Sequence, residues 1–588
     1  MNKQQSIPII ETDVLIVGSG PAGGAAALLL ATYGIKALMV TRFNWLAHTP
    51  RAHITNQRTL EVLRDVGVEQ EALDIGTPQD LMGHNVICES LTGEELGRLH
   101  SWGTSPERKA DYKNASPCPM LDIPQTLMEP ILVSNAAKRG TKTRFNSEFI
   151  SMTQDENGVT SKLKDRVTGQ QFEVRSKYLL GADGSNSVIA KQLALPFEGE
   201  MGLAGSINIL FDADMTKYVA HRPSVLYWVL QPGSDVGGVG MGVVRMVRPW
   251  NQWLAIWGYD INEGPPDLPD DEAIRIVRNL VGDQELDVKI KSISTWTVNH
   301  MYATKLSEGR VFCMGDAIHR HPPTNGLGSN TSIQDAYNIC WKIAMVLRGN
   351  ANEKLLESYD KERAPIAKQI VERANKSVAD YGRIFESLGL MSTKDPAQMI
   401  SNIAERKNNT AAGAAKRKAL REAIHNKNYE FNAHGVELNH RYVSDAVATD
   451  GTDEPAYHKD KELFYHPTTF PGARLPHCWL YNDGKEVSTL DLAGKGRFTL
   501  FTGLGGEQWS VAAEILASNL NIDIFSVVVG PGQDVEDLFG EWARLSEIDD
   551  DGVLLVRPDG HVCFRAFTKC ADPHHTLHEA LSTVLGLS

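Results

Sequence analysis

Three glycines near the start of the chain have a spacing that lets protein backbone approach a phosphate group. Gly18, Gly20 and Gly23 form the pattern G-x-G-x-x-G between an apolar run, DVLIV, and a helix-forming run, AAALLLA. The first glycine permits a tight turn, the second makes room for a pyrophosphate, and the third lets the helix pack on the strand. The N-terminus of that helix offers unpaired N–H groups to the anion. The pattern predicts a dinucleotide site, with further contacts from Pro21 and Ala22.

The residues after the second predicted strand, 36–40, depart from the usual pattern of such a site. An acidic residue normally follows this strand and binds the adenosine ribose. Thr41 and Arg42 occupy that place in this chain. A threonine hydroxyl can still hydrogen-bond the ribose, and an arginine can stack on adenine or reach a phosphate. We therefore expect both residues to contact the adenosine end of the cofactor.

Two later motifs indicate that the dinucleotide is FAD. The segment KYLLGADGSNSV places an aspartate at the end of a strand, and a second strand, 310–314, runs into a Gly-Asp pair. A carboxylate in that place can accept hydrogen bonds from ribityl hydroxyls, with a cap of the turn as the alternative for Asp316. A Pro/Gly loop then leads into an apolar-faced helix, whose N-terminus would face the flavin edge that becomes anionic on reduction. The expected FAD contacts here are Asp183, Gly315, Asp316, Pro323, Gly326, Gly328, Ser329 and Asn330.

These three motifs, in this order, resemble those of the class A flavoprotein aromatic hydroxylases, the group typified by para-hydroxybenzoate hydroxylase. The segments PRAHITNQRTLEVLRDVG and IPQTLMEPIL and the long C-terminal extension look like the phenol hydroxylase branch of that family. The family's Asp-Gly element is usually followed by a serine and an arginine, and it serves both FAD and the nicotinamide. Ser187 is present here, while Ala190 takes the place of the arginine.

The resemblance implies an α/β fold with a Rossmann-like FAD-binding domain, an inserted β-rich substrate domain and a C-terminal thioredoxin-like domain. No C-x-x-C pair occurs, so we expect the last domain to have a structural or interface role. The expected boundaries are 1–187 and 305–374 for the FAD-binding domain, 188–304 for the substrate domain, 375–441 for a helical segment and linker, and 442–588 for the C-terminal domain.

The same resemblance implies hydride transfer from NADPH or NADH to FAD, addition of O2 at flavin C4a to give a hydroperoxide, and attack by a phenol ortho to its hydroxyl. The expected substrate is a small phenol, chlorinated as in 2,4-dichlorophenol, and the product is a catechol. A hydroxyphenyl acid is the alternative substrate, with Arg245 or Arg248 available to pair with its carboxylate. A flavin-dependent halogenase is disfavoured because no W-x-W-x-I-P segment occurs. A non-enzymatic FAD-fold carrier is the remaining alternative.

His53, in the segment PRAHITN, is the candidate for the group that accepts the phenolic proton. A phenolate attacks faster than a phenol because the charge raises the electron density of the ring. A histidine with a reference pKa of about 6.5 can accept that proton at neutral pH. Members of the phenol hydroxylase branch carry at this place a residue that contacts the phenol hydroxyl. The alternative is a histidine whose ring is merely satisfied by backbone groups.

Several other side chains complete the predicted site. Arg51 is the expected partner of an FAD phosphate, and Gln125 is the expected contact of the ribityl chain or a phosphate. His319 and His321, beside a Pro-Pro pair, are expected to shape the loop rather than to act in chemistry. The residues expected to contact the substrate are His53, Tyr227, Trp228 and Pro323.

The composition excludes several classes of partner. The chain has 588 residues and a net charge of −14 with interleaved acidic and basic residues, which argues against binding nucleic acid or an anionic membrane. Seven scattered cysteines indicate reduced thiols in a cytoplasmic protein and no metal cluster. The N-terminal segment MNKQQSIPIIETD has no apolar signal-like core, and no uninterrupted apolar run reaches membrane length. We expect a soluble cytoplasmic homo-oligomer, a dimer or a tetramer.

Overall fold

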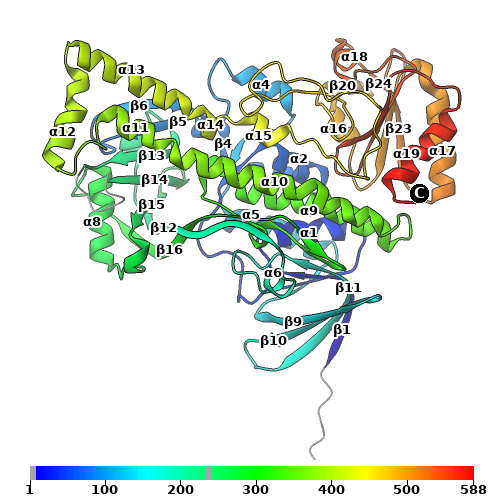
Figure 1. Cartoon of the computed structure of the whole chain (residues 1–588), viewed down its shortest axis with the longest axis horizontal. Coiled ribbons are helices and arrows are strands. Elements are labelled where there is room, and N and C mark those ends of the chain that lie inside the picture. The colour runs from blue at the N-terminus through cyan, green and yellow to red at the C-terminus, as the bar shows by residue number, and fades with distance from the viewer. Residues whose placement is uncertain (1–7, 233–239, 588) are drawn as a thin grey trace, which may run out of the picture.

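The structure is a computed structural model that describes residues 8–232 and 240–587. Two large sheets, a helical segment and a C-terminal domain make up this part of the chain, and the long helix α10 (Lys354–Ala379) runs from the second sheet to the C-terminal domain (Figure 1). Residues 1–7, on which part of the expectation about the N-terminus rests, lie outside the described residues. No helix in the described ranges has both the length and the apolar content that a membrane crossing requires.

The first sheet contains the predicted glycine turn and is assembled from two distant segments. Strand β1 pairs in parallel with β2 on one side and with β11 on the other, and β18 pairs in parallel with β11. The strand that was predicted from residue 13 begins at Ile9, because Ile9–Thr12 find partners in β11. Its strands are β1 (Ile9–Val17), β2 (Ala37–Val40), β8 (Lys142–Arg144), β9 (Ser147–Asp155), β10 (Gly158–Asp165), β11 (Gln171–Gly181), β17 (Ser307–Glu308) and β18 (Val311–Cys313).

Three helices pack beside this sheet and carry the predicted cofactor residues. Helix α1 (Pro21–Thr32) follows the glycine turn and contacts both α5 (Gln125–Lys138) and α9 (Gly328–Leu347). The short helix α6 (Val188–Gln192) follows β11. The helices therefore bring the segments around residues 18, 125 and 328 to one end of the sheet.

The second sheet is mostly antiparallel and includes two strands from the first segment of the chain. Strands β5 and β6 extend it through β13, so residues 84–100, which were expected in the FAD-binding domain, pair with strands of the expected substrate domain. Short alternating runs do not show which sheet they join, because pairing with β13 depends on residues far away in the sequence. The strands are β5 (His84–Cys88), β6 (Glu95–His100), β12 (Phe197–Asp212), β13 (Ser224–Leu230), β14 (Met241–Arg248), β15 (Gln252–Tyr259), β16 (Lys289–Ala303) and β19 (His319–Arg320).

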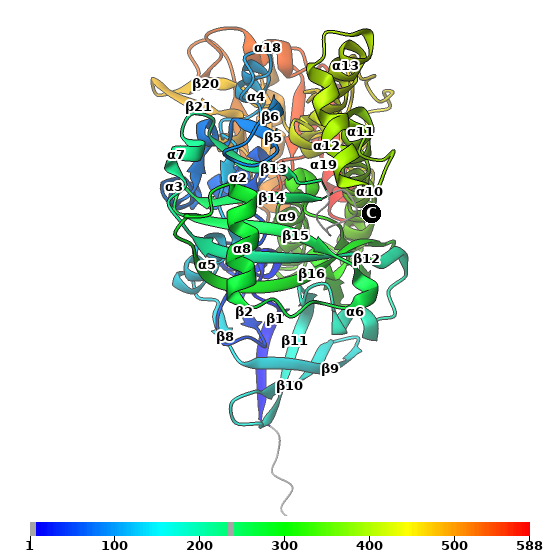
Figure 2. The same cartoon turned by 90° about the vertical axis from the view of Figure 1, so that its left-hand side faces the viewer.

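One face of the second sheet is covered by helix α8 (Asp270–Val281), which lies across its strands in Figure 2. A Cβ atom on Gly242 would lie 2.7 Å from Leu280 of this helix, so the side chains that share the face of Gly242 point toward α8. On the opposite face, Trp228 of β13 packs against Tyr381 of the helical segment, with ring centroids 4.3 Å apart. Successive residues of a strand therefore contact different parts of the protein, because their side chains point to opposite faces of the sheet.

A three-stranded sheet joins these two parts. Strand β7 (Leu121–Asp122) pairs with β3 (Ile54–Thr55) and with β4 (Thr77–Pro78). The helical segment then continues with α11 (Tyr381–Leu388), α12 (Pro396–Ala404), α13 (Ala411–Asn426), α14 (Asn428–Phe431) and α15 (His434–Leu438). The remaining helices before it are α2 (Gln57–Asp65), α3 (Glu69–Ile75), α4 (Lys109–Ala115) and α7 (Thr216–Val219).

The C-terminal domain has the expected thioredoxin-like order of elements. Its four-stranded sheet runs β23-β22-β25-β26, with β22 and β23 parallel and joined by a helix, and with β25 and β26 as a hairpin followed by a second helix. The elements are β22 (Phe498–Thr502), α17 (Glu507–Leu520), β23 (Ile524–Val528), β25 (Val553–Val556), β26 (Val562–Ala566) and α19 (Pro573–Val584); beside them lie β20 (Trp479–Asn482), β21 (Lys485–Ser488), α16 (Thr489–Leu492), β24 (Val535–Glu536) and α18 (Glu541–Leu545).

A buried ion cluster fastens this domain to α9 and α10. Arg557, from the β25–β26 hairpin, donates to both carboxylate oxygens of Glu362 at 2.5 and 3.0 Å, and Lys342 of α9 donates to the same carboxylate at 2.7 Å. Asp559 accepts from Arg557 as well. Burial would raise the pKa of Glu362, but Arg557 and Lys342 hold it well below its usual range. The carboxylate is therefore charged, and its burial depends on its cationic partners.

We predict that Arg557→Met, which keeps the bulk but removes the guanidinium, lowers the free energy of unfolding by about 3–5 kcal/mol, because it leaves buried charge without its main partner. Denaturant unfolding of the full chain measures the change. Arg544→Met removes an exposed arginine of the same domain and should cost less than about 0.5 kcal/mol. Equal effects of the two substitutions would contradict a structural role for the cluster.

Candidate functional site

The glycine turn has the shape that a pyrophosphate site requires. Gly18 has φ of +112°, and a Cβ there would lie 2.0 Å from the carbonyl oxygen of Ala182. A Cβ on Gly23 would lie 2.0 Å from the carbonyl oxygen of Gly18. On Gly20, by contrast, the nearest atom to a Cβ is 3.9 Å away, and no side chain caps α1 there. The space beside Gly20 and the uncapped N–H groups of α1 fit the diphosphate of FAD.

The other two motifs meet this turn. Ala182 precedes Asp183, so the contact between Gly18 and Ala182 places the second motif directly against the first. Gly315 has φ of +63°, and a Cβ there would lie 3.1 Å from the Cβ of Ala22, which sets the third motif against the start of α1. The turn at Gly315 leaves the carboxylate of Asp316 exposed, as a partner for ribityl hydroxyls would be.

Asp183 already has partners on its own segment. Its carboxylate accepts the Ser187 hydroxyl at 2.5 Å and the N–H groups of Val188 and Ile189 at 2.7 and 3.2 Å. These bonds cap the N-terminus of α6. The contact of Asp183 with FAD stays a prediction, and the local role of its side chain is that of a helix cap.

The Pro/Gly loop ahead of α9 is locked onto β3. A Cβ on Gly326 would lie 2.7 Å from the Cβ of Ile54, so the loop and β3 touch through a glycine. The amide of Asn330 donates to the carbonyls of Ile54 and Gly326 at 2.8 and 2.6 Å, and it accepts the N–H of Asn56 at 3.0 Å. The side chain of Asn330 is therefore engaged, which leaves its backbone as the part available to a flavin.

Several predicted residues of this loop and of the adenosine side remain open to a ligand. Pro323 is exposed, and Ser329 is half-buried at the start of α9. A Cβ on Gly328 would meet only the ring of His321, at 3.7 Å. Arg42, two residues after β2, and Arg51 are exposed, whereas Thr41 is buried.

A buried carboxylate that the sequence analysis did not single out fixes the turn at Gly315. Asp335, on α9, accepts the N–H of Gly315 at 3.1 Å, contacts the Nε2 atom of His319 at 3.0 Å and accepts from Arg363 at 2.8 Å. Burial would raise the pKa of Asp335, but Arg363 and His319 hold it below its usual value. Asp335 lies two turns along α9 from Gly328, on the same face, and this helical spacing was the signal available in the sequence.

The two loop histidines have the environments expected of residues that shape the loop. His319 is paired with Asp335, as described above. Burial, together with the neighbouring His319, lowers the pKa of His321 to about 4, and its Nδ1 atom lies 2.7 Å from the carbonyl oxygen of Pro322. His321 is thus neutral at physiological pH.

His53 lies at the junction of β3, β7 and the second sheet, in a buried polar group with two partners. Its Nδ1 atom is 3.6 Å from Oδ1 of Asp122, and its Nε2 atom is 2.9 Å from the carbonyl oxygen of Pro50. Arg245 of β14 donates to the other oxygen of Asp122 at 2.5 Å. From the sequence, Arg245 was expected only as the partner of an acidic substrate, and Asp122 was not expected in the site. Asp122 directly precedes the segment IPQTLMEPIL, which was its only sequence signal.

The hydrogen bonds of His53 assign its tautomer. A carbonyl oxygen only accepts, so the neutral ring carries its proton on Nε2 and keeps a lone pair on Nδ1. Neither Nδ1 of His53 nor Oδ1 of Asp122 has a hydrogen-bond partner. Burial and the charge of Arg245 lower the pKa of His53 against the opposing effect of Asp122. Burial would raise the pKa of Asp122, yet Arg245 and His53 hold it below its usual value. The group is a neutral base beside a carboxylate.

The two aromatic residues predicted for the substrate pocket point in opposite directions. Leu226 lies opposite Arg245 in the sheet register, so Trp228, two residues on, shares the face of Arg245. Tyr227 lies on the α8 face, is fully buried, and donates to the carbonyl oxygen of Arg222 at 2.9 Å. The two side chains lie on opposite faces of the sheet, and their contacts with substrate stay predictions.

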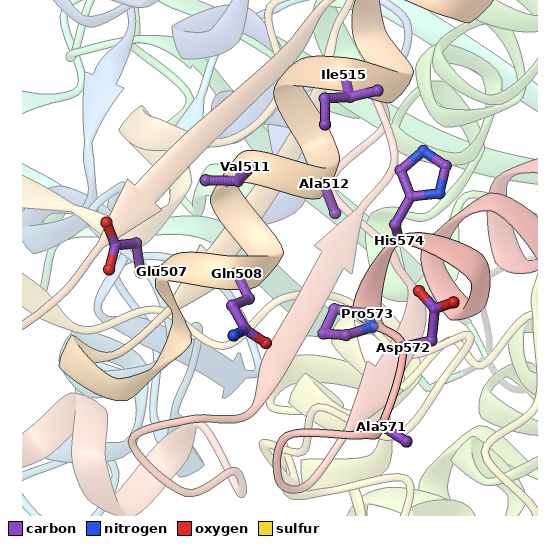
Figure 3. Close-up of a pocket in the computed structure, with 9 residues that line it drawn as sticks. All are labelled: Glu507, Gln508, Val511, Ala512, Ile515, Ala571, Asp572, Pro573 and His574. Atoms are coloured by element: carbon purple, nitrogen blue, oxygen red, sulfur yellow. The ribbon is translucent and has the colours of Figure 1, made fainter.

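The C-terminal domain contains a hollow of its own, of about 300 Å3, between α17 and α19. Figure 3 shows Val511, Ala512 and Ile515 of α17 on one side and Pro573 and His574 of α19 on the other. A second hollow, of about 410 Å3, lies between this domain and α15. None of the residues predicted to contact FAD or substrate lines either of them.

The fold and the converging glycine turns define an α/β flavoprotein, and comparison with known proteins identifies its family. The family model described as FAD binding domain matches residues 11–374, and that described as aromatic-ring hydroxylase, C-terminal matches residues 468–587. The chain belongs to this family of FAD-dependent aromatic-ring hydroxylases, and it is a flavoprotein aromatic monooxygenase. Its resemblance to the phenol hydroxylase branch is confirmed by the individual relatives.

Individual relatives are similar over nearly the whole chain. The 2,4-dichlorophenol 6-monooxygenase of Delftia acidovorans is 55% identical over 587 residues, which cover 100% of both chains. The phenol 2-monooxygenase of Pseudomonas sp. (strain EST1001) is 52% identical over 98% of this chain and 93% of its own. The crystal structure of the flavin-dependent monooxygenase PieE with FAD and substrate superposes with a TM-score of 0.95, at 42% identity, over 99% of this chain and 100% of its own.

We predict that Gly20→Ala weakens FAD binding by at least about tenfold, because the added methyl group occupies the space that the pyrophosphate needs. The thermal midpoint should change little, since the methyl group meets no atom within 3.9 Å. Quenching of flavin fluorescence measures the affinity. Gly382→Ala, in α11 where a Cβ also meets nothing within 4 Å, is the matched control and should bind FAD as the natural chain does. Unchanged affinity in Gly20→Ala would remove this turn from the site.

Proposed function

We propose that this chain hydroxylates a phenol at the ortho position to give a catechol, using NADPH or NADH and O2. The names of its relatives at 52–55% identity support a phenol, and the relative at 55% supports a chlorinated one such as 2,4-dichlorophenol. We further propose that it acts in the cytoplasm as a dimer or tetramer. The seven free thiols, most of them buried, are in keeping with a reducing compartment.

The observation that carries the proposal is that Nδ1 of His53 holds a lone pair and has no hydrogen-bond partner. When bound, FAD supplies the reduced ring that activates O2 for transfer of one oxygen atom to the aromatic ring. A phenol hydroxyl beside His53 can donate to Nδ1 and pass its proton to it as the ring is attacked. The imidazolium that forms lies 3.6 Å from the carboxylate of Asp122, which stabilises the new charge.

The link between the flavin loop and His53 supports the placement of the substrate. Asn330 and Gly326 bind Ile54, which is the residue next to His53. The polar group of His53 is thus attached to the loop that is predicted to lie against the flavin. Trp228 shares the face of Arg245, and its ring packs against Tyr381 of α11, with ring centroids 4.3 Å apart.

A hydroxyphenyl acid is the weaker candidate substrate. Arg245 is buried and already pairs with Asp122, while Arg248 is exposed at the end of β14. A substrate carboxylate would therefore compete with Asp122 for Arg245. Asp122, left buried without its cation, would then carry an uncompensated charge.

Oxidation of NADPH and NADH should be measured across a panel of phenols with product identification. We expect phenol and 2,4-dichlorophenol to stimulate oxidation and to yield catechols, with one catechol per nicotinamide oxidised. A 4-hydroxyphenyl acid serves as the comparison and should stimulate little. Preference for the acid, or nicotinamide oxidation without a hydroxylated product, would contradict the proposal.

We predict that His53→Asn lowers kcat/KM for phenol by about 10²-fold, the contribution of a positioned base. The loss should be smaller for 2,4-dichlorophenol, because a more acidic phenol needs less help from a base. In the natural chain the rate should fall only below the lowered pKa of His53, where the ring becomes protonated, and stay level above it. In His53→Asn the rate should rise with pH toward the pKa of the phenol itself.

The exposed His221, in the predicted substrate domain, provides the matched control as His221→Asn. Asp122→Asn tests the second member of the group. It should lower kcat/KM more for phenol than for 2,4-dichlorophenol, because the imidazolium loses its counter-charge. Equal losses for both phenols together with an unchanged pH profile would remove His53 from the proposed role.

A further inference from the structure

Helix α5 brings a buried carboxyl group to the predicted pyrophosphate site. It packs along α1 so closely that a Cβ on Gly24 would lie 3.2 Å from Leu132. One turn before Leu132, Glu129 faces Gly20, and its Oε1 atom would lie 3.9 Å from a Cβ on that glycine. Glu129 is only 2% exposed. Its carboxyl group therefore borders the space into which the diphosphate of FAD must fit.

The partners of Glu129 are neutral donors. Gln125 donates to Oε1 at 2.5 Å, and the N–H of Ala47 donates to Oε2 at 2.7 Å. Within residues 8–232 and 240–587, no lysine, arginine or histidine forms an ion pair with it. Burial raises the pKa of Glu129 despite these two hydrogen bonds and the more distant charges of Arg51 and His48. Arg51 and His48 are the charged or titratable groups whose charges act on Glu129.

Two anions compete for the same positive end of α1. The uncapped N–H groups at Gly20 favour negative charge, which the carboxylate of Glu129 supplies when FAD is absent. The diphosphate would bring further negative charge into the same desolvated space. Like charges at short range favour the protonated form of the weaker acid, which here is the carboxylate.

We propose that Glu129 takes up a proton when FAD binds, so that a neutral carboxyl group rather than a carboxylate faces the diphosphate. The proton comes from solvent and adds to one carboxylate oxygen, and no other bond is made or broken. The acid can then donate a hydrogen bond to a phosphate oxygen. Because the proposal rests on the predicted pyrophosphate position at Gly20, the Gly20→Ala test distinguishes failure of that position from failure of the proposal itself.

Proton uptake makes the affinity for FAD depend on pH. The pKa of Glu129 is higher in the complex than in the free protein, so binding is strongest below the pKa of the free protein. The dissociation constant rises with pH between the two pKa values, by at most about tenfold per pH unit for one proton. Above the pKa of the complex it becomes level again.

The experiment is a titration of the full-length, FAD-stripped protein with FAD from pH 5.5 to 8.5, followed by flavin fluorescence and by calorimetry in buffers of different ionisation enthalpy. We expect the natural chain to take up a proton and its dissociation constant to rise with pH. Glu129→Gln should take up no proton, lose the pH dependence, and bind FAD more tightly than the natural chain at pH 8.5.

Two further variants separate Glu129 from its surroundings. Glu71→Gln changes a carboxylate that contacts α5 through Asn135, away from α1, and should keep the pH dependence. His48→Asn removes the histidine whose charge acts on Glu129 and should also keep the pH dependence. Absence of proton uptake in the natural chain overturns the proposal even if Glu129→Gln fails to fold. So does retained pH dependence in Glu129→Gln, or its loss in His48→Asn.

Discussion

The site depends on a close backbone contact that leaves no room for a Cβ atom. Gly18 rests against the carbonyl group of Ala182, and Gly23 rests against that of Gly18, at distances where a Cβ would overlap an oxygen atom. This contact joins the first strand and helix to the end of β11. Because β18 pairs with β11, the same contact sets the position of Gly315 and of the loop that leads into α9. The three chain segments can therefore meet only because Gly18 and Gly23 have no Cβ atom.

The second requirement is charge balance in places that water does not reach. Asp335 holds the turn at Gly315 and is balanced by Arg363, and Asp122 faces His53 and is balanced by Arg245. A buried carboxylate without a cation would take up a proton and lose its function as an anion. In both cases the arginine comes from a different element than the carboxylate, so each charge pair also fixes two elements relative to each other.

Much of this arrangement could be predicted from local patterns. The glycine turn, the Gly315-Asp316 turn and the helix after the Pro/Gly loop are written in consecutive residues, and the structure places them together. The roles of Asp122 and Asp335 depend on contacts with partners more than a dozen residues away, so the sequence did not single these two residues out. One constraint was local: neighbours in a strand face opposite sides, so Tyr227 and Trp228 lie on different faces of the sheet. The assignment of β5 and β6 to the second sheet had no such signal, because strand pairing is a long-range property.

The ion cluster of Arg557, Glu362 and Lys342 limits which C-terminal domains can be combined with the rest of the chain. Glu362 and Lys342 lie on the helices beside the flavin loop, and Arg557 and its neighbour Asp559 lie in the C-terminal domain. A chimaera whose last domain lacked a cation at the place of Arg557 would leave the buried carboxylate of Glu362 with Lys342 alone to balance it. The C-terminal domain is thus compatible only with α9 and α10 helices that carry the complementary charges, and the two regions must change together in evolution or in design.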